Sequence, residues 1–124
     1  IGGDFNEQLN ELLLTYQSDT TAISTRNLAT LDWEIISKIK KETVYKVLRE
    51  LMTNMKKYSK ASAVLLTFHQ RGKNIIIEYS DNGQGCTLKN KNGLQNAENR
   101  IQAIKGTIIF ESQPGNGFRS KISI

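Results

Sequence analysis

Two strand-like segments joined by a very short connection constrain the fold of this chain more than any other feature. Residues 63–70 alternate apolar and polar side chains, and residues 73–80 are rich in isoleucine. The connection between them, Arg71-Gly72-Lys73, is typical of a hairpin turn. Strands joined so closely pair antiparallel, so a purely parallel, doubly wound sheet is excluded.

Three amphipathic helices are predicted around this hairpin. Asp4 can cap the first, whose apolar stripe consists of Phe5, Leu9, Leu12 and Leu13. The second and clearest helix runs from about residue 37 to residue 58, with a core-facing stripe of Val44, Val47, Leu48, Leu51 and Met55. The third runs from about residue 94 to residue 104, and Gly106 is expected to end it as a glycine usually ends a helix.

Further strands are expected at residues 20–28, 107–112 and 118–124, and a polar connection containing Trp33 precedes the second helix. Residues 82–93 are dominated by Gly, Asn and Lys, which predicts a polar, mobile loop. The order of these elements predicts an α+β fold. We expect a two-layer sandwich of about three helices on one face of a mixed, mostly antiparallel sheet.

The composition limits the class of protein without choosing a function. A chain of 124 residues suffices for one domain, residues 1–124, and 38% hydrophobic with 23% charged residues is typical of a globular protein. The 17 basic and 12 acidic residues give a net charge of +5, which suits a polyanionic partner but selects none. The lone Cys86 excludes an intrachain disulfide and indicates a reducing compartment. It is interpreted as an incidental thiol.

A polar stripe on the second helix is the first of three candidate site motifs. Glu50, Asn54, Lys57 and Tyr58 are three or four residues apart, which places them on one face beside the apolar stripe. An amide oxygen such as that of Asn54 suits Mg²⁺, and a lysine such as Lys57 can contact phosphates. Glu50 can orient or deprotonate an attacking group. An ordinary exposed helix face explains the same residues, so the stripe alone does not decide.

The other two motifs are turns that contain glycine. Residues 81–85, D-N-G-Q-G, follow the isoleucine-rich strand, where Asp81 can accept a hydrogen bond from an amine such as that of adenine. Glycines there let the backbone approach a flat ring, although an Asp-Gly or Asn-Gly turn needs no ligand. In residues 91–94, K-N-G-L, a glycine opens a helix whose free amides favour phosphate oxygens, or simply serves as a cap.

The order and spacing of the three motifs resemble the GHKL ATPase superfamily, and within it the catalytic domain of sensor histidine kinases. Residues 50–62 are similar to the N box, residues 81–85 to the G1 box, and residues 92–94 with 98–101 to the G2 region. The closing segment from Gly106 to Phe118 is similar to the last hairpin of that family. The resemblance covers nearly the whole chain, least clearly before Asp32, and implies a Bergerat-type ATP-binding fold.

The resemblance also implies roles for individual residues. Asn54 would coordinate Mg²⁺, Lys57 would contact phosphate with Tyr58 beside it at the nucleotide, and Glu50 is the candidate general base. Asp81 would bind the adenine amine. Three glycines and a leucine complete the implied cofactor site: Gly83 and Gly85 would line the adenine pocket, and Gly93 and Leu94 would lie at the phosphate end of the lid.

Two positions depart from the family pattern. Position 58 is Tyr where many relatives have His, and Lys91 stands where a fuller lid motif has a glycine. Only about eight residues separate Gly85 from Gly93, which resembles the short-lid subfamily of kinases whose response regulators are typically transcription factors. The lost glycine bears on the geometry of the lid more than on nucleotide binding.

The implied function is transfer of the ATP γ-phosphoryl group to a histidine on a separate dimerisation domain, for relay to a response regulator. His69, the only histidine, falls in a strand pattern and is interpreted as structural or exposed. The acceptor helices are expected before Ile1 in a parent kinase. The fragment itself is expected to be a cytoplasmic, monomeric domain, whose parent could be anchored in the inner membrane.

Three alternatives remain open at this point. An anti-sigma-type serine kinase or a gyrase-like ATPase shares the motifs, although a gyrase-type machine would carry a further transducer domain. A catalytically silent pseudo-kinase that serves as an interaction module would have a broken nucleotide site, whereas Asn54, Asp81, Gly83 and Gly85 are all present. Direct nucleic-acid binding is disfavoured because aromatic residues are few and are not interleaved with basic ones.

Overall fold

The computed structural model of the chain describes residues 4–84, 94–112, 115 and 117–124. Within these residues the chain forms α1 (Phe5–Leu14), β1 (Ala22–Arg26), α2 (Lys38–Asn54), β2 (Ala63–Arg71), β3 (Asn74–Asp81), α3 (Leu94–Ala103), β4 (Thr107–Ser112) and β5 (Phe118–Ser123). Two short 3₁₀-helices, η1 (Leu28–Thr30) and η2 (Trp33–Ile35), lie where only a polar connection was predicted. A π-helical turn, η3 (Met55–Ser59), follows α2.

The described strands form one sheet in the order β1-β2-β3-β5-β4. β1 runs parallel to β2, and the other neighbouring pairs are antiparallel. In the central hairpin Leu66 lies opposite Tyr79 and Phe68 lies opposite Ile77. The side chains that alternate toward the core on β2 and β3 are Val64, Leu66, Phe68, Ile75, Ile77 and Tyr79. The predicted mixed, mostly antiparallel sheet is therefore confirmed.

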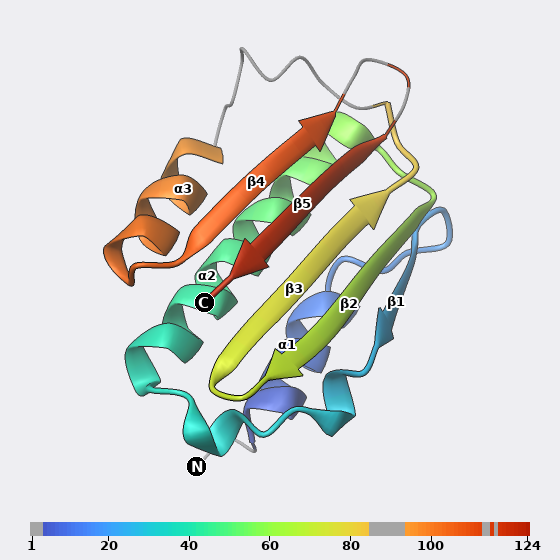
Figure 1. Cartoon of the computed structure of the whole chain (residues 1–124). Helices are drawn as coiled ribbons and strands as arrows, with labels where there is room; N and C mark the ends of the chain where they lie inside the picture. The colour runs from blue at the N-terminus through green and yellow to red at the C-terminus, as the bar shows by residue number, and fades with distance from the viewer. Residues whose placement is uncertain (1–3, 85–93, 113–114, 116) are drawn as a thin grey trace.

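All three described α-helices cover the same face of the sheet (Figure 1). α2 lies behind the middle strands, and its apolar stripe, Val44, Val47, Leu48, Leu51, Met52 and Met55, is at most 3% exposed. One core thus unites sheet and helices, which confirms the predicted two-layer α+β sandwich. At about 25 cal/mol per Å² of apolar surface, such burial is the main stabilising contribution in a domain of this size.

Side chains cap the starts of α1 and α2, and the cap of α1 is the predicted Asp4. The Asp4 carboxylate accepts a hydrogen bond from the backbone N–H of Glu7 at 2.8 Å, and the Ser37 hydroxyl accepts one from Lys40 at 3.3 Å. Phe5 packs edge-on against Trp33 with ring centroids 4.7 Å apart. The same indole donates a 2.6 Å hydrogen bond to Asn6, so α1 and η2 are held together at one end of the helical layer.

Gly106 follows α3, but it does not hold the left-handed position by which a glycine was expected to end the helix. The residue in the left-handed region after the helix is Lys105, with φ 61°, whereas Gly106 donates its N–H to the Ile101 carbonyl at 2.9 Å. A Cβ at Gly106 would lie 2.6 Å from the backbone oxygen of Ser123. Glycine is required here because β5 passes so close, and not because of a positive φ.

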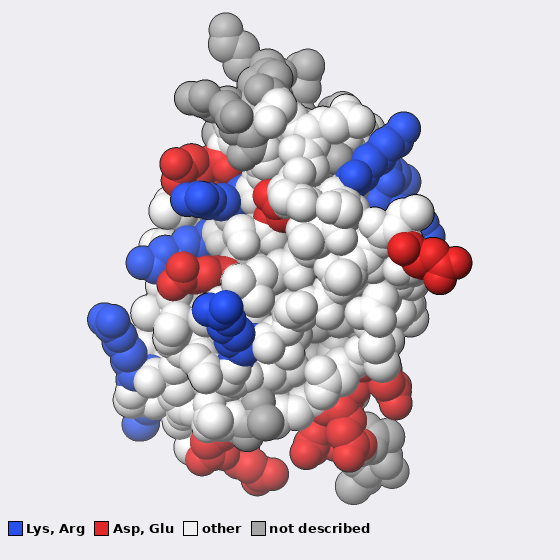
Figure 2. Space-filling view, turned by 90° about the vertical axis from the view of Figure 1, so that its right-hand side faces the viewer, with Lys and Arg blue, Asp and Glu red and all other residues white. Residues whose placement is uncertain are grey.

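The charged residues do not form a continuous patch on the side of the molecule where β1 is the sheet edge. Figure 2 looks at this side, and among its described residues basic and acidic side chains are interspersed around a largely uncharged centre. The net charge of +5 is thus not gathered on this face.

The turn before β5 meets the end of β3 at Gly117. This residue has φ 77°, and a Cβ there would overlap the backbone oxygen of Asp81. Gly115, in the same turn, has φ 84°, but a Cβ there would meet nothing within 4 Å. The two glycines therefore share a backbone conformation that disfavours L side chains, and only Gly117 also needs the space.

We predict that Gly117→Ala destabilises the domain more than Gly115→Ala does. The strain of a left-handed alanine costs about 1–2 kcal/mol at either position. The collision with Asp81 adds about 1–3 kcal/mol at Gly117 alone, as overpacking typically does. Urea unfolding of both variants measures the difference. Equal losses of unfolding free energy would contradict the close approach of the turn to Asp81.

Candidate functional site

The described parts of the three motif segments lie at one end of the molecule, although they come from separate parts of the chain. In Figure 1 the C-terminal end of α2, the C-terminal end of β3 and the N-terminal end of α3 all lie toward the top. These ends carry the N-box-like helix segment, Asp81 with Gly83, and Leu94. The arrangement brings together most of the predicted site residues that the structure describes.

The polar stripe of α2 lies at the border of the core, as predicted. Glu50 and Asn54 are one turn apart on the helix and are both partly buried, while the neighbouring Leu51 is fully buried. The stripe is polar because it faces a hollow at the rim of the core and not the sheet. Its residues are therefore placed by the burial of their apolar neighbours.

The helix changes its geometry immediately after Asn54. Met55–Ser59 form a π-helical turn, and Lys60 then adopts a left-handed conformation, φ 51°, and donates its N–H to the Met55 carbonyl at 2.8 Å. Lys57 and Tyr58 lie in this wider turn and are exposed. Such turns occur frequently at functional sites, since they shift side chains relative to the regular helix. Sequence spacing alone predicted a regular α-helix to Tyr58, and the π turn corrects that.

A hollow of about 280 Å³ lies over this end of α2. It is lined by residues of α2, of the π turn and of α3: Arg49, Glu50, Thr53, Asn54, Lys57, Tyr58 and Asn96. All four predicted residues of the α2 stripe thus contact one space. Arg49, Thr53 and Asn96 were not singled out from the sequence, because a charged, a hydroxyl and an amide residue on exposed helix faces are common.

Two buried polar atoms beside this hollow lack a hydrogen-bond partner in the described part of the chain: Glu50 Oε2 and Asn54 Nδ2. A buried polar group without a partner costs about 1–3 kcal/mol, so such atoms are uncommon in a settled core. A carboxylate and a carboxamide can therefore both offer binding capacity to a ligand here. The donor set suits a polar ligand and not an apolar one.

The other carboxylate oxygen of Glu50 is held by α3. Arg100 Nε lies 2.6 Å from Glu50 Oε1, in an ion pair whose side chains are 38% and 17% exposed respectively. The contact spans fifty residues of sequence and joins the first and third motifs. Arg100 lies in the G2-like segment, but no role was predicted for it, because no local sequence pattern reveals a contact over that distance.

Asp81 is positioned by its own strand and by the turn that follows. Its Oδ2 accepts a 2.7 Å hydrogen bond from the Tyr79 hydroxyl, and its Oδ1 accepts one from the Gly83 N–H at 3.0 Å. The next residue, Asn82, accepts from the backbone N–H groups of Ser62 and Ala63 at 3.0 and 2.9 Å. The D-N-G turn is thus anchored to the start of β2, with the Asp81 carboxylate in a defined orientation.

The remaining predicted residues divide into two groups. Leu94 opens α3, but its side chain is only 3% exposed and packs in the core, so it can offer a ligand only its backbone. Gly85 and Gly93 lie outside the described residues, as do Cys86, Lys91 and most of the predicted loop at residues 82–93. Asp81 and Gly83 do not line the hollow over α2.

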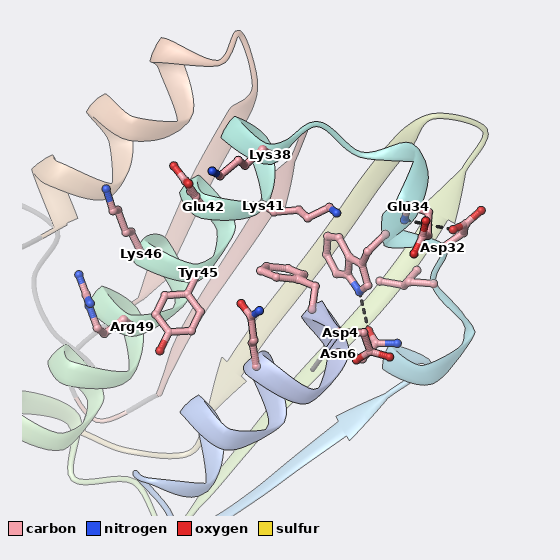
Figure 3. Close-up of a pocket in the computed structure, with 14 residues that line it drawn as sticks. Asp4, Asn6, Asp32, Glu34, Lys38, Lys41, Glu42, Tyr45, Lys46 and Arg49 are labelled. Carbon is pink, nitrogen blue, oxygen red and sulfur yellow. Dashed lines mark hydrogen bonds between the residues drawn. The ribbon is translucent and has the colours of Figure 1, made fainter. Parts of the chain in front are cut away.

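A larger hollow of about 660 Å³ lies elsewhere, between α1, η2 and α2 (Figure 3). Its α2 side carries Lys38, Lys41, Lys46 and Arg49, and its other side carries Asp4, Asp32 and Glu34. It shares only Arg49 with the hollow beside Asn54. We assign the candidate site to the smaller hollow, because the unpartnered Glu50 and Asn54 atoms are there.

Among the described residues there is no group of three or more His, Cys, Asp or Glu side chains that could hold a metal ion. None of the described helices is both long and apolar enough to cross a membrane.

The fold is that of histidine kinase domains. The histidine kinase domain of the blue-light activated kinase from Erythrobacter litoralis EL346 superposes with a TM-score of 0.76 at 14% identity, covering 97% of this chain and 58% of that one. The Acinetobacter baumannii histidine kinase AdeS superposes with a TM-score of 0.61 at 19% identity, covering 97% and 60%. At these identities the likeness establishes the fold alone.

Sequence relatives are sensor histidine kinases. The chain is 28% identical over 87 residues to the sensor histidine kinase ComP of Bacillus subtilis (strain 168) and 29% identical over 86 residues to the sensor histidine kinase YvfT of the same strain. These matches cover 65% and 68% of this chain but only 11% and 23% of the relatives. No protein-family model matches the chain. The resemblance recognised in the motifs is thereby confirmed at the level of the domain.

We predict that Glu50 and Arg100 are energetically coupled. A double-mutant cycle with Glu50→Gln, Arg100→Gln and the double variant should give a coupling of about 1–2 kcal/mol, because the carboxylate is mostly buried. Urea unfolding measures the four stabilities. The matched control is the exposed pair His69 and Glu78, whose side chains are 45% and 52% exposed and 3.6 Å apart.

The control pair should couple by less than about 0.5 kcal/mol, as exposed pairs usually do. A Glu50–Arg100 coupling no larger than that of the control would show that α3 does not hold the carboxylate.

Proposed function

We propose that this chain is the ATP-binding catalytic domain of a two-component sensor histidine kinase. The observation that carries the proposal is that the described parts of three sequence motifs lie at one end of the fold. There, within the part of the chain that the structure describes, Glu50 and Asn54 have unpartnered polar atoms beside a hollow. The sensor histidine kinase relatives support the same class of activity.

The adenine amine of ATP would bind to Asp81. The carboxylate accepts hydrogen bonds from Tyr79 and Gly83, which fix its orientation at the end of β3. The amine at carbon 6 of adenine donates a hydrogen bond that a carboxylate can accept. Guanine has a carbonyl, an acceptor, at the same carbon. Gly83, and with it Gly85, would allow the base to approach the backbone.

The phosphates would extend from the adenine toward the hollow over α2. Lys57 and Arg49 line that hollow and supply positive charge for phosphate oxygens. The backbone at Leu94, with Gly93 before it, would contribute N–H groups at the start of α3. Tyr58 lies beside Lys57 in the π turn and would flank the same phosphates.

Asn54 would supply the protein ligand for Mg²⁺. Its partly buried carboxamide fits an ion that is otherwise shared with phosphate oxygens and water, and turning the amide exchanges its oxygen and nitrogen. When bound, Mg²⁺ would neutralise charge on the phosphate oxygens.

Glu50 would act on the attacking histidine. In the proposed transfer, a ring nitrogen of the acceptor imidazole forms a bond to the γ-phosphorus while the bond from that phosphorus to the bridging oxygen breaks, leaving ADP. The proton of the imidazole would pass to Glu50 or be oriented by it. Arg100 holds one carboxylate oxygen, which leaves Oε2 for that contact.

The acceptor histidine would belong to a separate dimerisation domain of a parent protein. His69 lies on β2 with its side chain 45% exposed and 3.6 Å from Glu78, away from the α2 hollow. The phosphoryl group would then pass to a response regulator. We place the domain in the cytoplasm, where ATP is available.

We predict magnesium-dependent binding of a non-hydrolysable ATP analogue to this chain. Isothermal titration with the analogue and with ADP, each with and without Mg²⁺, measures it. Asp81→Asn should weaken both nucleotides by about tenfold or more, because one hydrogen bond to a charged group is lost and a repelling amide replaces it. Asn54→Ala should remove the Mg²⁺ dependence while leaving ADP binding in the absence of Mg²⁺ intact.

The exposed Asp19→Asn serves as the matched control and should bind like the unaltered chain. Absence of binding at millimolar nucleotide would contradict the proposed function and favour a silent interaction module.

A further inference from the structure

Tyr79 is a buried tyrosine on β3, two residues before Asp81. Its side chain is only 2% exposed, and its ring packs edge-on against Phe118 of β5 with centroids 6.0 Å apart. On the neighbouring strand it lies opposite Leu66. On the other side, Ser120 of β5 lies opposite Tyr79. The ring itself packs against Phe118, a contact that a phenylalanine at position 79 would keep.

The hydroxyl of Tyr79 is hydrogen-bonded to Asp81. It donates a 2.7 Å hydrogen bond to Oδ2, since residues 79 and 81 point to the same face of the strand. Burial, together with the nearby Asp81 charge, raises the pKa of Tyr79 far above its ordinary value. The hydroxyl is thus the donor, and the Asp81 carboxylate the acceptor, in this hydrogen bond.

The two hydrogen bonds to Asp81 come from different directions. Gly83 N–H binds Oδ1 from the turn, and Tyr79 O–H binds Oδ2 from the core. A carboxylate held at one oxygen only can rotate about its Cβ–Cγ bond, whereas one held at both oxygens has a fixed plane. A fixed plane gives the lone pairs of the carboxylate defined directions, along which the amine of a base would have to approach.

We propose that Tyr79 is a positioning residue that sets the preference of this site for bases with an exocyclic amine. It acts by fixing the plane of the Asp81 carboxylate, and it does not contact the nucleotide. This inference rests on the proposed function, because it concerns the same adenine site.

The test compares two nucleotides in two proteins. Purine riboside triphosphate is ATP without the exocyclic amino group, so the ratio of its Kd to that of ATP measures the contribution of the amine alone. In the unaltered chain this ratio should be about tenfold or more. In Tyr79→Phe, which keeps the ring and removes the hydroxyl, it should fall to about threefold or less, with ATP affinity reduced and purine riboside triphosphate affinity unchanged.

Two further variants separate positioning from general stability. Tyr16→Phe removes a different tyrosine hydroxyl, which is hydrogen-bonded to Thr53 at 2.9 Å, and should leave the ratio unchanged. In an Asp81→Asn background, Tyr79→Phe should have no further effect on the ratio, because the group that it positions is already gone.

Each outcome has a distinct meaning. If the unaltered chain binds neither nucleotide, the proposed function fails and the inference fails with it. If the unaltered chain prefers ATP and Tyr79→Phe keeps the full preference, the proposed function stands and the inference is overturned. Loss of folded structure in Tyr79→Phe would also overturn it, since the hydroxyl would then stabilise the core and not the carboxylate.

Discussion

Burial of one face of α2 against the middle of the sheet is the constraint on which the rest of the molecule depends. The buried stripe that includes Val47, Leu48 and Leu51 fixes the rotation of the helix about its axis. Once that rotation is set, Glu50 and Asn54 must lie at the rim of the core, because they are about a quarter-turn away. The free energy that fixes the position of the polar residues therefore comes from burial of their apolar neighbours. The polar residues themselves need not contribute to it.

The periodicity of apolar residues was sufficient to predict the architecture and the α2 part of the site. Alternation on β2 and the three-to-four spacing on α2 both report burial, which is also what organises the fold. Features that depend on contacts distant in sequence were not predictable. The Arg100–Glu50 pair is such a contact, and so is the approach of β5 that requires glycine at position 106. The role of Tyr79 was not predictable for another reason. In the sequence it is one of several large residues of a buried strand, and nothing marks its hydroxyl as a partner of Asp81.

The turn after β3 shows that a structural and a functional explanation of one motif can both hold. The Asn82 side chain accepts hydrogen bonds from the backbone at the start of β2, a purely structural role. Asp81 receives one hydrogen bond from the core and one from the turn, so its carboxylate has a defined orientation. Anchoring by the one residue is what gives the other a defined direction. Asn82 therefore has the structural role in this turn, and Asp81 has the proposed binding role.

The position of β5 in the sheet has a consequence for the order in which the domain can form. It follows every other described strand in the chain, yet it is inserted between β3 and β4 and is not added at an edge. Until it arrives, the hydrogen-bonding groups along β3 face solvent and Tyr79 lacks the Phe118 ring. During synthesis the incomplete sheet thus exposes an open strand edge that invites pairing with other chains. Pairing of β5 with β3 covers that edge. The same step brings Phe118 against Tyr79, whose hydroxyl holds the Asp81 carboxylate.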